Sequence, residues 1–173
     1  MSLAELLVAL VTFGLVAAAA FTLLDEGQRA WAFGVARAET QQSARVALAR
    51  LTGEIRVAGR GGRDFDAVAV AAPDTIVLQQ DLDGDGVIAA RGERVTWRLA
   101  GTILRRDAGG GAQPIIDGVR SFVLEYLDAA GAPTASARDV RTVVITLVTE
   151  AESVLAAREV TTTFATRVRL RNR

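Results

Sequence analysis

A single carboxylate, Glu5, interrupts an otherwise apolar run that extends from Leu3 to Leu24. The run covers about 22 residues, or about 33 Å as an α-helix, which matches the hydrocarbon core of a bilayer. A carboxylate near the middle of a membrane span costs roughly 2.5–3.5 kcal/mol, and somewhat less near an end. We therefore expect Glu5 to be a functional residue whose counter-ion is the amine of Met1, either its own or that of a neighbouring copy.

A cleavable secretory signal is the alternative interpretation of this run, because the small residues at positions 17–20 are typical of a cleavage site. No basic residue precedes the run, however, and Glu5 stands where a signal carries positive charge. The pattern favours a retained helix that is buried in a membrane or in a bundle of similar helices.

The helical periodicity continues beyond the apolar run into residues 25–58. Apolar side chains recur there at steps of three and four, the spacing of an amphipathic helix. These positions are Ala44, Leu48, Leu51, Ile55 and Ala58. Arg50 and Glu54 form an i,i+4 pair that we expect on the exposed side. The glycine-rich residues 59–62 end the helix, so one rod of about 87 Å is predicted.

Downstream, the period changes to that of β-strands separated by turn residues. The predicted strands are Thr75–Gln80, Glu93–Leu99, Thr102–Arg106, Val119–Leu127, Val140–Thr149 and Glu159–Leu170. An antiparallel sheet has one buried face, which the apolar stripe of residues 44–58 would cover. The sequence therefore predicts an α+β fold, in which a long N-terminal α-helix packs on an antiparallel β-sheet head. Its parts are the apolar helix (1–24), the amphipathic continuation (25–58) and the head (63–173).

Charge and composition argue against several classes of function. The sequence has 20 basic and 20 acidic residues, so no net field favours nucleic acid as a partner. It has no cysteine and no histidine, which removes disulfides, thiolates and the usual general base at neutral pH. No nucleophile–base pair or cofactor motif is present in the sequence. We therefore expect a protein that is not an enzyme.

Residues 81–88 have the oxygen-rich spacing of a calcium-binding loop. The candidate ligands are Asp81, Asp83 and Asp85. Ca2+ is the one cofactor that the sequence indicates. The bidentate glutamate of such a loop belongs at its twelfth position, whereas Glu93 comes one place late. The alternative, which we favour, is a hairpin turn in which the aspartates only bond the backbone.

Three arginines alternate with apolar residues near the C-terminus, at positions 167, 169 and 171. Alternation places them on one face of a strand. They could contact DNA or an acidic partner, but no aromatic residues interleave to stack on bases. We favour a solvent-exposed strand face that pairs with Glu150 and Glu152 across the sheet.

The chain resembles a type IV pilin-like protein along its whole length. The resemblance is carried by the opening MSLAELLVALVTFGLV, with its acidic residue at position 5, and by the amphipathic continuation QQSARVALARLTGEIRVAGRGG. The stretches GERVTWRLAGTILRR and VRLRNR are similar to the W-type minor pilins and to the J-type minor pseudopilin of type II secretion.

This resemblance implies a mature chain that a prepilin peptidase has cut from a short leader, with Met1 at the N-methylated position. It also implies that Glu5 neutralises the terminal amine of an adjacent subunit during assembly. The expected function is a structural subunit of an extracellular type IV pilus-like filament, polymerised with itself or with other pilins.

Such a subunit would cross the inner membrane once, before membrane machinery assembles it into a filament at the cell surface. Two alternatives stay open. The chain could be a minor pseudopilin of a type II secretion system, or a monomeric membrane-anchored module for calcium binding or adhesion.

Overall fold

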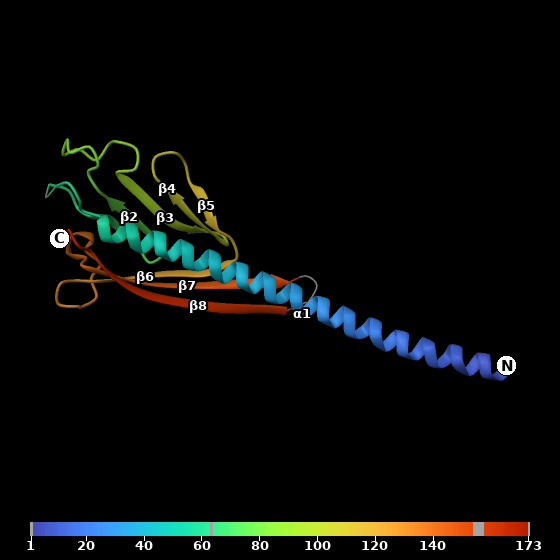
Figure 1. Cartoon of the computed structure of the whole chain (residues 1–173). Coiled ribbons are helices and arrows are strands. Elements are labelled where there is room, and N and C mark those ends of the chain that lie inside the picture. The colour runs from blue at the N-terminus through green and yellow to red at the C-terminus, as the bar shows by residue number, and fades with distance from the viewer. Residues whose placement is uncertain (1, 63, 154–157, 173) are drawn as a thin grey trace.

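The computed structural model describes residues 2–62, 64–153 and 158–172. It begins with a single helix, α1 (Leu3–Val57), which is 55 residues long. At 1.5 Å per residue, α1 extends for about 82 Å, close to the predicted rod. Figure 1 shows that the first half of α1 projects alone, whereas its second half lies against the strands.

The predicted α+β fold, a long N-terminal helix packed on antiparallel β-structure, is confirmed. The strands form two antiparallel sheets, however, and not the single sheet that we expected. The first sheet has the order β1-β2-β3-β4-β5 and the second has the order β6-β7-β8. The first contains β1 (Val68–Ala71), β2 (Thr75–Gln79), β3 (Arg94–Ala100), β4 (Ile103–Asp107) and β5 (Gln113–Ile116). The second contains β6 (Val119–Leu127), β7 (Thr142–Ser153) and β8 (Arg158–Arg169), with a 3-10 helix, η1 (Ala137–Asp139), before β7.

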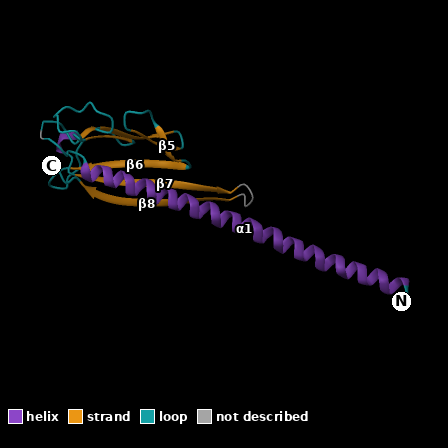
Figure 2. Cartoon of the chain, turned by 45° about the horizontal axis from the view of Figure 1, so that its top comes forward, coloured by secondary structure: helices purple, strands orange, loops and turns teal. Residues whose placement is uncertain are grey.

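The sequence does not predict β1 or β5, which are the edge strands of the first sheet. Both are 4 residues long, and β5 contains Pro114, which lacks the N–H that an interior strand needs. The remaining strands lie close to their predicted positions. The exception is β7, which continues beyond Thr149 because β8 pairs with it as far as Ser153. Figure 2 shows this long hairpin lying beside α1.

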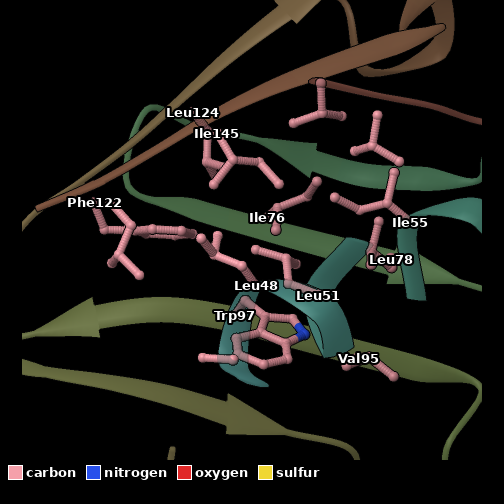
Figure 3. Packing of buried hydrophobic residues seen from close by; sticks show 14 of the residues in the cluster. Leu48, Leu51, Ile55, Ile76, Leu78, Val95, Trp97, Phe122, Leu124 and Ile145 are labelled. Carbon is pink, nitrogen blue, oxygen red and sulfur yellow. The ribbon is translucent and has the colours of Figure 1, made fainter. Parts of the chain in front are cut away.

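The core lies where the second half of α1 meets both sheets. Leu51 and Ile55 of α1 share one buried cluster with Trp97 of β3, Ile76 of β2 and Ile145 of β7 (Figure 3). The predicted apolar stripe of α1 is confirmed, since all of its members are buried. They are Ala44, Leu48, Leu51, Ile55 and Ala58. The core therefore joins segments that are far apart in the sequence.

A β-bulge interrupts the regular alternation of side chains in β6. Regular alternation would put Arg120 on the same face as the buried Phe122. The register of β6 against β7 shifts between Val119 and Ser121, so Val119 is buried and Arg120 is exposed. The Arg120 guanidinium then forms an ion pair with Glu150 at 2.6 Å.

Glu54 joins α1 to the first sheet, although we expected it on the exposed side with Arg50. Its side chain is only 18% exposed. One carboxylate oxygen accepts the Trp97 Nε1–H at 2.5 Å, and the other accepts the Arg106 Nε–H at 2.8 Å. Arg50 is present but more distant, at 3.5 Å. The expectation is wrong because strands remote in the sequence cover this turn of α1.

The far end of the chain caps the C-terminus of α1. The Asn172 Nδ2 amide donates to the carbonyl oxygens of Val57 and Ala58 at 3.1 and 3.2 Å. Gly59 follows with φ 78°, and a Cβ at this position would lie 2.8 Å from the Asn172 carbonyl oxygen. Glycine is therefore required here, and the predicted glycine stop of the helix is confirmed.

Candidate functional site

The first half of α1 is almost entirely exposed in the described part of the chain. Between Leu3 and Leu24 every residue except Ala17 is exposed, and the large apolar side chains there are 50% to 80% exposed. The helix is long and apolar enough to cross a membrane. This segment, residues 3–24, is called the apolar half below.

The hydroxyl groups in the apolar half are satisfied inside the helix. Thr12 Oγ1 donates to the Val8 carbonyl at 2.9 Å, and Thr22 Oγ1 donates to the Ala18 carbonyl at 3.0 Å. These bonds reduce the cost of placing a hydroxyl group in hydrocarbon. Glu5 is left as the only ionisable side chain of the apolar half.

Glu5 lies in the first turn of α1 and belongs to a capping box. Its Oε2 accepts the backbone N–H of Ser2 at 2.8 Å, and the Ser2 Oγ accepts the backbone N–H of Glu5 at 3.3 Å. The sequence signal for this capping box is the Ser-x-x-Glu pattern at residues 2–5, which does not depend on an amine counter-ion. Met1, the predicted source of that counter-ion, lies outside the described residues.

Glu5 has no cationic side chain within reach on the same helix. Among the described residues, the next cation along α1 is Arg29. It lies about 36 Å away along the helix axis, and it pairs with Asp25 at 2.7 Å. A counter-ion for Glu5 in an apolar environment must therefore come from a terminal amine or from another molecule.

The three aspartates of the predicted calcium loop lie together between β2 and β3. Asp81, Asp83 and Asp85 each offer one carboxylate oxygen within 4.8 Å of the others. Asp81 is buried, and its two oxygens accept the N–H groups of Gly84 and Gly86 at 2.6 and 3.1 Å. Asp83 and Asp85 are exposed and accept backbone N–H groups two residues further on. The loop thus contains Asx turns, while its exposed carboxylates could offer oxygens to Ca2+.

Glu93, just before β3, accepts hydrogen bonds from the backbone of this loop. It is 0% exposed, and its Oε1 accepts the Leu82 N–H at 2.9 Å. Its Oε2 accepts the N–H groups of Ala89 and Ala90 at 2.9 and 2.7 Å. These bonds, that from Leu82 first, outweigh burial and lower the pKa of Glu93 below its usual value. Glu93 is therefore the residue that orders the loop, a role that its displaced position in a calcium motif does not reveal.

Negative charges crowd the exposed part of the loop. The N–H of Asp85 bonds the Asp83 carboxylate and lowers its pKa. Desolvation and the charges of Asp85, Glu93 and Asp81 together outweigh that bond, so the pKa of Asp83 is raised. A cation bound here would reduce this repulsion.

The arginines at positions 167, 169 and 171 are exposed, as the sequence predicts. The expectation that Glu150 pairs with these arginines is wrong, because Glu150 pairs with Arg120 of β6 instead. The register of the β7–β8 hairpin explains the difference, since it places Val144 rather than an acidic residue opposite Arg167. The side chain of Glu152, the other expected partner, lies outside the described part of the chain.

No protein-family model matches the chain, and no curated protein matches it either. The chemistry of its described residues therefore carries the functional conclusion.

Proposed function

We propose that the chain is a structural subunit of an extracellular type IV pilus-like filament that polymerises through α1. The observation that carries this proposal is the uncovered apolar half of a helix whose other half packs on a folded head. Each large apolar side chain removed from water contributes roughly 1.5–3 kcal/mol. A bilayer before assembly and a bundle of equivalent helices after assembly are the two environments that supply this burial.

The shape of the subunit supports the same proposal. The apolar half and the packed half belong to one helix of 55 residues, and no proline interrupts it. Because the head lies at one end only, the apolar halves of neighbouring subunits can pack together while their heads remain outside the bundle (Figure 1). The subunit would cross the inner membrane once and then enter the filament at the cell surface.

Glu5 would direct the docking of one subunit on the next. In the isolated chain its carboxylate is satisfied by the Ser2 N–H and is exposed. Inside a dry bundle the same charge would require a cation, which the N-terminal amine of a neighbouring copy would supply. An ion pair of this kind is sensitive to the loss of either partner, which costs about 3–5 kcal/mol.

The test compares Glu5→Gln with Ser2→Ala in cells that carry the assembly machinery. Glu5→Gln removes the charge, so we expect normal membrane insertion but no entry into filaments. Ser2→Ala removes the hydroxyl of the capping box at a cost of about 1 kcal/mol but keeps the carboxylate, so filaments should still form. The measurements are the membrane-bound fraction and the yield of sheared filaments seen by electron microscopy.

Glu26→Gln is the matched control, because it removes a charge from the same helix beyond the apolar half. It should assemble normally. Filaments at wild-type yield from Glu5→Gln would contradict the proposal, and so would equal losses in Glu5→Gln and Ser2→Ala. That second result would mean that Glu5 acts only as a helix cap. A chain that stays monomeric in the membrane under all conditions would favour the anchored module instead.

A further inference from the structure

Two arginines face each other on the outer surface of the first sheet, and neither has an acidic partner among the residues that the structure describes. The antiparallel register of β3 and β4 places Arg98 directly opposite Arg105. Their chain neighbours Trp97 and Arg106 point inward to Glu54. Since successive side chains of a strand point to opposite faces, Arg98 and Arg105 share the outward face. Like charges directly opposite on neighbouring strands destabilise a sheet, so this pair needs a physical explanation.

The two guanidinium groups line a hollow with a volume of about 360 Å³. Thr75, Thr96 and Ala112 line the same hollow. The Arg105 Nη1 donates to the Ala112 carbonyl at 3.3 Å, which holds Arg105 against the β4–β5 loop. The Thr75 hydroxyl already donates to Asp74 Oδ1 at 3.2 Å. The donors that remain for a ligand are therefore the two guanidinium groups and the Thr96 hydroxyl.

One acidic residue, Asp107, also lines the hollow. Its Oδ1 accepts the N–H groups of Gly109 and Gly111 at 2.9 and 3.2 Å, so this oxygen is committed to the loop. Of the residues that the structure describes, none forms an ion pair with Arg98 or Arg105. Two positive charges and one negative charge leave the hollow net positive.

We propose that this hollow binds an oxyanion group, such as sulfate, phosphate or a carboxylate, between Arg98 and Arg105. Arginine presents its donors in a planar fork that matches the oxygens of these groups. A bound oxyanion would neutralise the repulsion that the register imposes. This site is independent of the proposed filament function, because it lies on the head and not on the apolar half.

The position of the hollow excludes the headgroups of the membrane that would hold α1. Arg98 and Arg105 lie beside residues that contact Glu54, which is about 45 Å along α1 from Leu24. The oxyanion is therefore either a free ion in the surrounding solution or an acidic group on a partner protein. Both sources present negatively charged oxygens to the arginines. A free ion is tested by adding sulfate, and a partner protein by adding an acidic peptide.

The experiment follows thermal unfolding of the full chain in a non-ionic detergent, with sulfate compared against chloride at equal ionic strength. Binding should give a saturable rise in Tm in the wild type. At a sulfate concentration of ten times the Kd, the ratio of folded to unfolded protein should rise about eleven-fold. In Arg98→Gln this rise should be absent. At low salt without sulfate, Arg98→Gln should unfold at a higher Tm than the wild type, because the repulsion is gone.

Arg94→Gln is the matched control. Arg94 lies on the same exposed face of β3, but it stands opposite Gln79 and does not line the hollow. The Arg94→Gln variant loses the same charge as Arg98→Gln but leaves the hollow intact. It should therefore keep the response to sulfate and should not gain stability at low salt. Sulfate also stabilises proteins by general exclusion from their surface, and that effect acts equally on all three proteins.

A second arm adds a glutamate-rich peptide and measures its binding by fluorescence anisotropy. Binding that is lost in Arg98→Gln, without a response to sulfate, would assign the site to the carboxylates of a partner protein. A response to sulfate alone would assign it to a free ion. The proposal is overturned if neither ligand distinguishes the wild type from Arg98→Gln, or if Arg98→Gln is less stable than the wild type at low salt.

Discussion

At the scale of single residues, buried carboxylates are the most informative side chains of the head. Glu93 is 0% exposed and receives three backbone N–H groups, from Leu82, Ala89 and Ala90. A glutamine at this position has one acceptor oxygen and an amino group that would face an N–H donor. The carboxylate is therefore required to keep the β2–β3 loop in its present form.

Glu93→Gln should lower the Tm by several degrees at neutral pH, and the loss should vanish in acid. The hydrogen bonds depress the pKa of Glu93 below 4.5, so its stabilisation is present above that pH. The stabilisation is lost as the pH falls through the lower pKa of the folded protein. Asp83 has the opposite sign, because its pKa is raised above 3.8 and protonation favours its folded form. Unfolding curves of the wild type and of Glu93→Gln between about pH 3 and 7 measure how the difference in Tm depends on pH.

Glu125→Gln is the control for that experiment, since Glu125 is an exposed residue of β6. It should leave the Tm and its pH dependence as they are in the wild type. If Glu93→Gln and the wild type lose stability in parallel over the acid range, Glu93 does not order the loop through its charge.

At the scale of elements, α1 is attached to the two sheets by different interactions. Its apolar stripe enters the common core, whereas Glu54 makes a polar connection to β3 and β4. The Glu54 and Arg106 side chains are each only 18% exposed, so their ion pair is partly shielded from water. Shielding makes the loss of one partner more damaging than at the surface.

Glu54→Ala should reduce the free energy of unfolding by about 2 kcal/mol or more, because hydrogen bonds to charged groups typically contribute about 1.5–3 kcal/mol. The change leaves the Trp97 Nε1–H and the Arg106 guanidinium without this acceptor. Urea unfolding followed by tryptophan fluorescence measures the effect, because unfolding exposes the buried Trp97 whereas Trp31 is already 73% exposed. A double-mutant cycle with Arg106→Ala isolates the contribution of the ion pair.

Arg50→Ala tests the exposed member of the same group. The Arg50 side chain is 50% exposed and lies 3.5 Å from Glu54. Its removal should change the free energy of unfolding by no more than about 0.5 kcal/mol. Equal losses from Arg50→Ala and Glu54→Ala would mean that the surface pair, rather than the contacts with β3 and β4, holds this turn.

At the scale of the whole molecule, the chain divides by burial and not by secondary structure. The buried positions of α1 begin at Ala44, and beyond the apolar half the first partly buried position is Ala32. Residues 3–24 contribute nothing to the core in the isolated chain. The helix is therefore continuous in structure but serves two environments.

Deletion of residues 1–28 should leave a head that folds cooperatively and no longer requires detergent. The removed segment contributes no described residue to the buried core, and the retained part of α1 still covers the core. Near-ultraviolet circular dichroism, which reports the fixed environment of the buried Trp97, should match that of the full chain. A shortened protein with a molten spectrum would show that the apolar half contributes to the stability of the head.

Sequence patterns predict those parts of this fold that depend on neighbours along the chain. The three-and-four spacing of α1 and the glycines after it define the helix and its buried stripe, because helical geometry relates residues within one or two turns. The interiors of most strands follow from alternation in the same way. The capping pattern at Ser2 and Glu5 is equally local.

Several other features depend on contacts between residues far apart in the chain. Alternation says which face of a strand is apolar but not which strand pairs with it, so the division into two sheets is not visible in the sequence. For the same reason, the sequence does not predict three side-chain contacts or pairings. They are Glu54 with Arg106, Glu93 with the Leu82 N–H, and Arg98 opposite Arg105.

The sequence by itself determined the apolar helix, its single carboxylate and the amphipathic stripe, since each is a property of consecutive residues. Only the tertiary structure decided which charges meet on the head, because side-chain partners across strands are selected by packing and register over the whole domain.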